Sequence, residues 1–420
     1  MKLLRLAAAA ALFAPLAAQA TTGYFQHGYG IKAKGMGGVG IALPQDALAA
    51  ATNPAGMAWV GNRLDAGIDW FAPDRGAEIT AANGVPGRPG SYDANGRKGF
   101  LIPEFGYNRM LNPNLALGVS VYGNGGMNTT YNNNPFGGFY GGFNPGGVDL
   151  IQMFIAPTLA WKFSENHSVG VSLNLAYQQF GAQGLEGFDN AIFSSSPGNV
   201  TNRGRDDSSG WGLRLGWTGR VTPNVTLGAT YQTKTRMGRF EKYQGLFAEQ
   251  GDFDIPENYG VGIALKATPK LTLAADLQRI NYGDVKAVGN PTDCLFAFTC
   301  QLGASNGAGF GWRNTTVYKL GVAYEWSPQL TLRGGFVTLR QPIPASQTFI
   351  NIVAPGVVEE HLTLGLTWQL SRDTELSLAY MHAFEKKVSG AGSIPPLFGG
   401  GEANLRMKQN ALGIAFGWRM

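Results

Sequence analysis

Residues 169–178 read Val-Gly-Val-Ser-Leu-Asn-Leu-Ala-Tyr-Gln, so that apolar side chains alternate strictly with small or polar ones. Successive side chains of a β-strand point to opposite faces, which gives such a segment one apolar and one polar face. The same alternation is present in residues 114–124, 270–282 and 407–419. The pattern predicts an all-β protein whose strands each meet an apolar environment on one side.

Runs of this kind recur along the chain, and we count about fourteen of them, an even number within the range of bacterial outer-membrane barrels. They lie near residues 62–71, 100–110, 114–124, 152–163, 167–180, 210–221, 224–236, 257–267, 270–282, 313–326, 329–340, 360–370, 374–386 and 407–419. Many reach the roughly 9–11 residues that a tilted strand needs to cross a bilayer. Their connections alternate between about 3–5 and about 18–32 residues, as expected for short periplasmic turns and long extracellular loops. The pattern predicts a transmembrane antiparallel β-barrel of about 14 strands.

The composition favours this barrel over other classes of protein. The 420 residues include 61 Gly, 44% hydrophobic residues and only 15% charged residues. A mean hydropathy of −0.08 argues against membrane-spanning helices, as does the lack of any run of roughly 18–20 apolar residues. A soluble β-sandwich is the alternative, but its exposed faces would be charged. Here the faces opposite the apolar rows are mostly Gly, Ala, Ser, Thr and Gln.

The N-terminus has the pattern of a secretory signal peptide. Lys2 and Arg5 precede an apolar run over residues 6–18, and Ala18-Gln19-Ala20 provides an A-x-A cleavage site. Cleavage after Ala20 would remove residues 1–20 and lower the formal charge from +5 to +3. This charge is small and spread out, so we expect no nucleic-acid partner.

Residues 21–60 lie before the first predicted strand and show little alternation. Their length suits a hatch, meaning a plug folded inside the lumen of a barrel formed by residues 61–420; a flexible periplasmic tail is the alternative. The run Gly35-Met36-Gly37-Gly38-Val39-Gly40 satisfies G-x-G-x-x-G. We reject a dinucleotide site because neither the preceding strand nor the later acidic residue is present. The glycines favour a tight backbone path instead.

Residues that could support catalysis or bind a metal are few. The four histidines, His27, His167, His361 and His382, do not form a metal-ligand spacing, and no G-x-S-x-G is present. We therefore expect no catalytic residues, no bound metal and no other cofactor. Cys294 and Cys300, a close pair in an exported protein, predict a disulfide, with two free thiols as the alternative.

One part of the N-terminal region resembles a known family. The run 35–42, then Asp46, then Asn53-Pro54-Ala55-Gly56, is similar to the hatch of the FadL/TodX family, which are outer-membrane transporters of long-chain fatty acids and aromatic hydrocarbons. Residues 243–256, 271–276 and 376–382 extend the resemblance, which covers essentially the whole mature chain. It implies a fourteen-stranded barrel with an N-terminal hatch that includes Gly35, Gly37, Gly38, Asn53, Pro54 and Ala55. The chain departs from the family at its end, Trp418-Arg419-Met420, where an aromatic residue is common.

The resemblance also implies a function. It is passive uptake of hydrophobic compounds, either long-chain fatty acids or aromatic or aliphatic hydrocarbons, across the bacterial outer membrane. In the family, extracellular loops capture the ligand, a pocket in the barrel receives it, and it leaves sideways past the hatch. A general diffusion porin, a structural or adhesive barrel and an outer-membrane enzyme are the alternatives. We expect a monomer whose partners are the hydrophobic ligand and the lipid and lipopolysaccharide of the membrane.

Two long loops carry apolar side chains three or four residues apart, a spacing that predicts short amphipathic helices with an extracellular ligand groove between them. The candidate groove residues are Leu185, Phe188, Ile192, Phe193, Phe240, Tyr243, Leu246 and Phe247. The alternative is that the two faces pack together and cap the barrel. A carboxylate ligand would also need a cation inside the barrel. The candidates are Arg214, Lys319 and Arg333, unless they pair with Asp276, Glu325 or Glu375 to hold the hatch.

Overall fold

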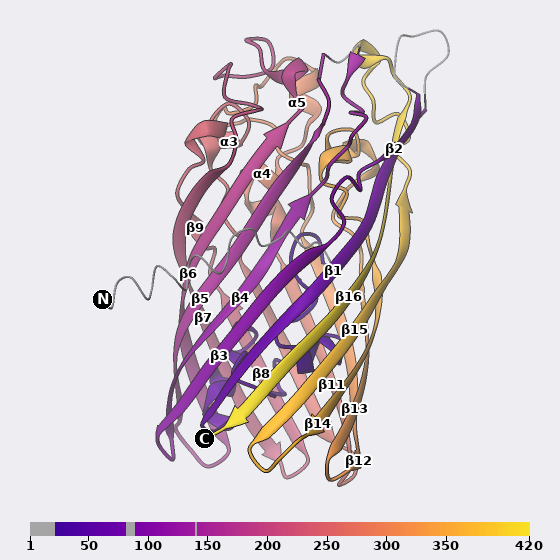
Figure 1. Cartoon of the computed structure of the whole chain (residues 1–420). Helices are drawn as coiled ribbons and strands as arrows, with labels where there is room; N and C mark the ends of the chain where they lie inside the picture. The colour runs from indigo at the N-terminus through magenta and orange to yellow at the C-terminus, as the bar shows by residue number, and fades with distance from the viewer. Residues whose placement is uncertain (1–21, 81–88, 139–140) are drawn as a thin grey trace, which may run out of the picture.

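The strands form a closed, tilted barrel in the computed structural model, which describes residues 22–80, 89–138 and 141–420 (Figure 1). Of the sixteen strands that pair in these ranges, β2 (Gly90–Asp93) and β9 (Arg236–Met237) are short additions, and the other fourteen form the wall. Each wall strand is antiparallel to its neighbours, and pairing of the last strand with the first closes the barrel. The predicted fold class is confirmed. The expected signal peptide lies outside the described residues.

The wall strands follow one another around the barrel in chain order. They are β1 (Arg63–Thr80), β3 (Phe100–Asn112), β4 (Leu115–Asn128), β5 (Gly147–Lys162), β6 (His167–Gln183), β7 (Asp206–Thr222), β8 (Val225–Gln232), β10 (Asn258–Lys266), β11 (Leu271–Ile280), β12 (Thr315–Ser327), β13 (Leu330–Leu339), β14 (Glu360–Gln369), β15 (Thr374–Val388) and β16 (Glu402–Arg419).

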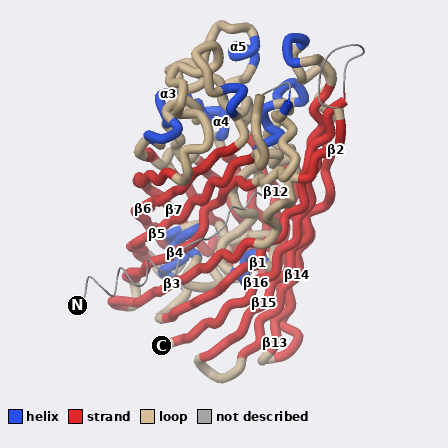
Figure 2. The backbone as a smooth tube through the Cα atoms, turned by 45° about the horizontal axis from the view of Figure 1, so that its top comes forward, coloured by secondary structure: helices blue, strands red, loops and turns tan. Residues whose placement is uncertain are grey.

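Short helices occur inside the barrel and in the long loops. The α-helices are α2 (Ile31–Lys34), α3 (Ala248–Gly251), α4 (Lys286–Gly289) and α5 (Asp293–Phe296), and the 3₁₀-helices are η1 (Ala49–Ala51), η2 (Pro54–Trp59), η4 (Glu186–Phe188), η5 (Glu241–Tyr243), η6 (Tyr282–Asp284), η7 (Ala345–Gln347), η8 (Ile350–Val353) and η9 (Pro396–Phe398). Among the described residues, no helix has both the length and the apolar character that a membrane crossing requires. Helices α3, α4 and α5 lie in the layer of long loops at one end of the barrel, called the loop end below (Figure 2).

The apolar rows face outward, as the alternation indicates for a barrel in lipid. On β6, Val169, Leu173 and Leu175 are each 38–43% exposed, whereas the intervening Ser172 and Asn174 are fully buried in the lumen. A soluble sandwich would show the opposite arrangement, because its apolar rows would be buried.

Several strands extend further toward the loop end than the alternation predicts. Strand β1 continues to Thr80 rather than residue 71, and β5 starts at Gly147 rather than residue 152. In these upper parts several inward side chains are apolar, for example Val148 and Leu150, which are buried, whereas the outward residues Asp149 and Glu78 are charged. The pattern of apolar outward and polar inward residues therefore does not continue there, and the predicted strands end early.

Residues 22–62, called the lumenal segment below, pack against the inner face of the wall. Many wall positions facing this segment are glycine, and a Cβ atom there would lie within 3.0 Å of an atom in residues 31–57. These wall glycines include Gly106, Gly118, Gly170, Gly216, Gly228, Gly262, Gly321, Gly335, Gly365 and Gly413. The close approach of wall and segment accounts for part of the high glycine content.

Candidate functional site

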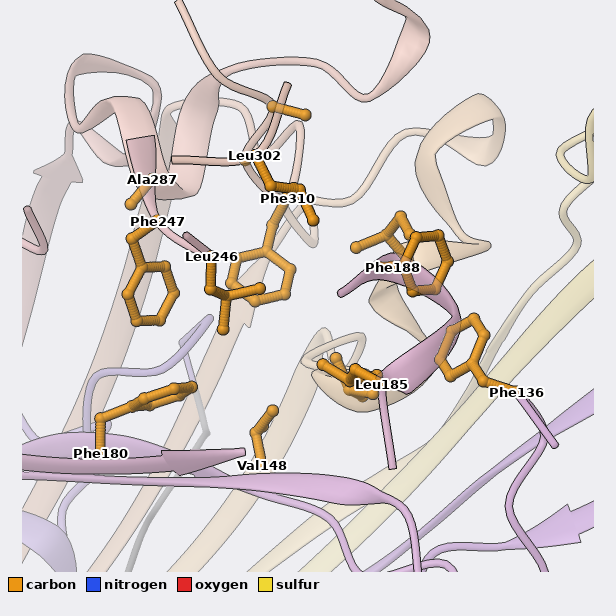
Figure 3. Close-up of a pocket in the computed structure, with 14 residues that line it drawn as sticks. Phe136, Val148, Phe180, Leu185, Phe188, Leu246, Phe247, Ala287, Leu302 and Phe310 are labelled. Atoms are coloured by element: carbon orange, nitrogen blue, oxygen red, sulfur yellow. The ribbon is translucent and has the colours of Figure 1, made fainter. Parts of the chain in front are cut away.

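An apolar cavity of about 50 Å³ lies beneath the long loops (Figure 3). It is lined by Phe136, Val148, Phe180, Leu185, Phe188, Leu246, Phe247, Ala287, Leu302, Ala308, Gly309, Phe310, Ile350 and Val353. None of these side chains is polar or charged, so the cavity can bind a ligand only through apolar contact.

The wall and five separate loops all contribute to this cavity. Val148 on β5 and Phe180 on β6 point into it from the wall, and η4, α4 and η8 provide further lining residues. The Phe180 ring meets the Phe247 ring edge to face, with centroids 4.6 Å apart. Phe136 meets Phe188 in the same way at 5.6 Å. Residues far apart in the sequence thus form one apolar surface.

The cavity is smaller than the ligands that its chemistry suits. A cavity of roughly 150 Å³ accommodates a benzene ring, whereas this one measures about 50 Å³. A ligand must therefore displace side chains or shift the loops. Each CH₂ group that leaves water contributes roughly 0.8 kcal/mol, so apolar contact alone can offset a modest rearrangement.

Only some of the eight candidate groove residues line the cavity. Leu185, Phe188, Leu246 and Phe247 line the cavity. Phe240 and Tyr243 are buried beside it against Phe180, with ring centroids 5.7 and 4.8 Å away, and Phe193 contacts Phe188 at 5.7 Å. Ile192 is 62% exposed and lies outside the lining.

The expected amphipathic helices are wrong. The segments contain only the three-residue 3₁₀-helices η4 and η5, because Gly187 and Gly245 interrupt the apolar spacing and favour turns. The sequence did not reveal Phe136, Val148, Phe180, Leu302, Phe310, Ile350 and Val353 as lining residues. Phe180 carried a usable signal, since it is apolar at an inward position of the otherwise small or polar face of β6.

A disulfide joins Cys294, in α5, to Cys300 within the loop between β11 and β12. The Phe296 ring inside this loop packs on Phe398 and Phe349, with centroids 5.1 and 5.8 Å away. Phe298 is 52% exposed. The disulfide therefore holds Phe296 in the aromatic layer next to the cavity.

Replacing both cysteines with alanine should loosen this loop without unfolding the barrel. Closing a loop of this size contributes about 2 kcal/mol through the unfolded state. Amide hydrogen exchange in residues 291–302 should then accelerate, while exchange in the wall strands should not change. Unchanged exchange in this segment would show that packing of Phe296 alone holds the loop.

An aromatic cluster lies between the loops and the start of the lumenal segment. Tyr24 contacts Tyr282 at 5.1 Å, Trp312 at 5.9 Å and Phe253 at 6.2 Å between ring centroids. The Tyr282 hydroxyl donates to the Thr22 carbonyl oxygen at 2.5 Å and accepts from the Phe25 amide at 3.3 Å. The loop that follows β11 therefore binds the first described residues of the chain.

The wall has a break between β3 and β4. The two strands pair only from Phe105 with Val121 downward to Asn112 with Leu115. Above this, residues 100–104 pair with β1, and residues 122–128 pair with β5. Within the described ranges, no β-ladder joins these two upper halves.

Residues 22–29, called the strap below, cover the edge of β4 that the break leaves free. The Gly126 amide donates to the Tyr24 carbonyl oxygen at 2.9 Å, and the Gln26 amide donates to the Asn124 carbonyl oxygen at 3.3 Å. The Gln26 side chain adds a bond to the Gly123 carbonyl oxygen at 2.7 Å. A short stretch of chain therefore closes the break from inside.

Asn53 anchors the other end of the lumenal segment to the wall. Its Oδ1 accepts from the Ala55 amide at 3.1 Å, which caps η2. Its Nδ2 donates to the carbonyl oxygens of Ile41 and Trp217 at 2.7 and 2.9 Å. Pro54 opens η2, and the Ala55 carbonyl oxygen accepts from the Ser168 hydroxyl at 3.0 Å. The Asn-Pro-Ala sequence thus connects the segment to β6 and β7.

Gly35, Gly37 and Gly38 lie where the lumenal segment turns and packs closely on the wall. Gly37 and Gly38 have φ values of +70° and +71°, a region that side chains disfavour. Gly35 is packed so closely on Gly365 that a Cβ atom would approach its Cα to 2.8 Å.

The three candidate head-group cations contact the lumenal segment rather than the cavity. Arg214 donates to the Thr52 carbonyl oxygen at 3.0 Å, Arg333 to Gln45 Oε1 at 3.0 Å, and Lys319 to the Gly38 carbonyl oxygen at 3.5 Å. Asp276 lies opposite Lys319 in the wall and accepts from the amides of Gly40 and Ile41. This geometry favours the alternative in which these residues hold the segment.

Ion pairs fix the middle of the lumenal segment. Lys34 is bound to Asp69 at 3.0 Å and to Glu104 at 3.5 Å, and Lys32 is bound to Glu375. All of these side chains are buried, so removing one partner would leave an uncompensated charge and would be strongly destabilising. The segment from residue 30 onward is thus held by buried ion pairs, whereas the described contacts of the strap are hydrogen bonds and aromatic contacts.

Asp252 and Asp254 lie in the loop that contains α3 and are partly buried. Partial burial, together with the negative charge of Asp254, raises the pKa of Asp252 to about 6. Neither residue lines the cavity. Among the residues that the structure describes, no group of His, Cys, Asp and Glu side chains could hold a metal ion.

Comparison with known proteins places this arrangement among outer-membrane proteins. The model of one family, described as "Outer membrane protein transport protein (OMPP1/FadL/TodX)", matches residues 8–419. In a comparison with curated protein sequences, nothing matches significantly.

Several solved structures share the fold. A Pseudomonas aeruginosa FadL homologue has a TM-score of 0.72 at 17% identity, with 94% of this chain and 99% of that chain covered. The Pseudomonas putida toluene transporter TodX has a TM-score of 0.70 at 19% identity, covering 95% and 100%. The Ralstonia pickettii toluene transporter TbuX has a TM-score of 0.65 at 18% identity, covering 94% and 99%.

Proposed function

Because the chain belongs to the family of outer membrane transport proteins described as OMPP1/FadL/TodX, we propose that it is a passive channel for hydrophobic compounds in the bacterial outer membrane. The observation that carries this proposal is the cavity beneath the loops, whose fourteen lining residues are all apolar. Such a site suits a ligand that water-filled porins exclude. The names of two solved relatives, each a toluene transporter, agree with this ligand class.

The route that we propose has three stages. A ligand first leaves water beneath the long loops and enters the cavity. It then passes the aromatic cluster in which Tyr24 of the strap packs on Tyr282 and Trp312. It leaves through the wall between β3 and β4 when the strap moves off the edge of β4. Residues 30–62 stay in place as the hatch, because buried ion pairs and Asn53 hold them.

Replacing Phe247 with aspartate tests the cavity. The carboxylate would be buried among apolar side chains, since Phe247 is 3% exposed, so ligand binding should weaken roughly ten-fold or more. Uptake of radiolabelled toluene and of a labelled alkane would be measured in cells that lack other such channels. The deficit should be largest at low ligand concentration.

Ile192 provides the matched control for this substitution. It lies in the loop between β6 and β7, one of the two loops that carry the candidate groove residues. It is 62% exposed and outside the lining, so Ile192→Asp should import ligand at the wild-type rate. The heat-dependent shift of the barrel on gel electrophoresis reports folding of both variants. Normal uptake of dilute ligand by a folded Phe247→Asp variant would place the binding site elsewhere.

A further inference from the structure

A polar groove of about 490 Å³ lies at the upper ends of β4, β5 and β6, near the loop end. Its charged lining residues are Arg97, Asp149 and Arg205. Asp149 points away from the lumen, because Val148 and Leu150 on either side of it are buried on the inner face of β5. The charged side chains of the groove therefore lie on the outer side of the wall, and no step of the proposed route uses them.

Two arginines from different parts of the chain share the carboxylate of Asp149. Its Oδ2 is bound by Arg97 Nη1 at 3.2 Å and also by Arg205 Nη2. The Arg205 side chain lies beside Gly181 of β6, where a Cβ atom would come to 3.8 Å from its Cγ. One carboxylate cannot neutralise two guanidinium groups, so the charged lining of the groove keeps a net positive charge.

The two guanidinium groups have donors to spare. Arg97 Nε, Arg97 Nη2 and Arg205 Nε make no hydrogen bond within the described residues. The two side chains are 34% and 39% exposed, so these donors can be reached from outside. The planar N–H forks of arginine match the oxygens of a phosphate group. Uncharged side chains that can bind the hydroxyl groups of a sugar line the rest of the groove, namely Asn128, Thr129, Thr130, Gln183 and Asn202.

The groove lies directly above the outer aromatic girdle of the barrel, on the side of the loop end. Tyr177 on β6 and Trp211 on β7 face outward and are 39% and 59% exposed. Gln179 connects this girdle to the groove, since its Nε2 donates to the Tyr177 hydroxyl at 2.8 Å and its Oε1 accepts from Arg205 Nη1 at 3.1 Å. Aromatic girdles mark the boundary between acyl chains and head groups. The two arginines therefore lie at the level of the outer-leaflet head groups.

The outer face below the girdle is apolar. Ile155 of β5 lies directly opposite Leu175 of β6, and the two side chains are 40% and 43% exposed. A molecule with a phosphate group in the groove can lay acyl chains on this surface. A free phosphate ion would make no use of it.

We propose that this groove binds the phosphorylated sugar head group of lipopolysaccharide, with one phosphate between Arg97 and Arg205 and acyl chains over Ile155 and Leu175. The phosphate would replace water on the spare donors, while Asp149 keeps the two arginines side by side. The inference goes beyond the proposed function, because it concerns a lipid that surrounds the barrel and not the compound that passes through it.

Lipid A with and without its phosphate groups tests the site. The full-length protein in detergent micelles would be titrated with each form, and native mass spectrometry would measure the bound fraction. The wild type should bind the phosphorylated form about ten-fold more tightly or better. Arg97→Gln and Arg205→Gln should each raise the dissociation constant of the phosphorylated form about five-fold or more, and that of the dephosphorylated form less than about two-fold. Equal binding of the two forms by the wild type overturns the inference even if the variants do not fold.

Arg406→Gln is the matched control. The Arg406 side chain is 34% exposed, the same fraction as that of Arg97, and is paired with Asp74 at 3.2 Å. It lies near the loop end on β16 and outside the groove, so this variant should bind both forms like the wild type. A loss in Arg406→Gln equal to that in Arg97→Gln would show attraction to scattered positive charge and overturns the inference. The heat-dependent gel shift reports folding of every variant.

Inorganic phosphate distinguishes a lipid site from a site for small anions. A large excess of it should leave lipid A bound, because each acyl CH₂ group that leaves water contributes roughly 0.8 kcal/mol. Displacement of lipid A by phosphate alone overturns the inference. Toluene binding, measured on the same samples, tests the proposed function separately: a wild type that binds lipid A but not toluene counts against the proposed function and supports this site.

Discussion

Replacing Gly38 with valine should open the barrel and give a large rise in ion conductance. Gly38 has a φ of +71°, and a Cβ atom there would lie 1.9 Å from the His27 carbonyl oxygen, which belongs to the strap. A β-branched side chain in this conformation, combined with the overlap, costs about 3 kcal/mol or more. Strap and turn cannot both keep their positions, so water and ions should enter the lumen. Single-channel recording in planar bilayers measures the change.

Gly61→Val is the control that separates backbone strain from steric overlap. Gly61 also has a positive φ, +73°, but an added Cβ atom would meet nothing within 4 Å. This variant should conduct as little as the wild type. A folded Gly38→Val barrel with wild-type conductance would show that the turn is not what closes the lumen. High conductance in the wild type would instead favour a general porin.

The barrel could be predicted from the sequence because a strand between lipid and a polar lumen alternates apolar residues with small or polar ones. On β6, every outward residue from Val169 to Tyr177 is apolar and its inward neighbours are small or polar, so alternation alone identifies the strand. The pattern fails where the environment is no longer lipid on one side and a polar lumen on the other. Val148 faces inward and is apolar, because it meets the cavity rather than water.

The same limit explains why the upper part of the first strand was missed. The predicted first strand ended at residue 71, so Arg75, which is buried on the inner face of β1, was not recognised as a residue of the wall. The loop residues could be found only in part, because their roles depend on contacts between distant segments. Phe188 and Phe247 were selected among the apolar residues of long loops, whereas Phe136 and Phe310, which also lie in long loops, were not. Single-sequence patterns report local environment, and this cavity is formed by segments separated by hundreds of residues.

A disulfide across the wall break should stop ligand release without preventing ligand binding. A Cβ atom at Gly123 would lie 3.0 Å from the Cγ2 atom of Ile102, so the substitutions Ile102→Cys and Gly123→Cys place two thiols close enough to bridge β3 and β4. The bridge would hold together the two halves that no β-ladder joins within the described ranges. With the native cysteines replaced by alanine, the oxidised protein should import labelled toluene at least about ten-fold more slowly, if lateral exit supplies nearly all of the flux. Reduction with dithiothreitol should restore the rate.

The matched control places a bridge where the two strands already pair. Phe105 lies directly opposite Val121, so Phe105→Cys with Val121→Cys joins β3 to β4 below the break without closing it. This variant should transport at the same rate in both redox states, which separates closure of the break from mere tethering of the strands. Mass spectrometry establishes that each bridge is complete. Only a ligand that leaves between β3 and β4 would be slowed by the first bridge and not by the second. If the oxidised variant bridged across the break imports ligand as fast as the control, the ligand does not leave between β3 and β4. A route through the lumen past the hatch then becomes the better account.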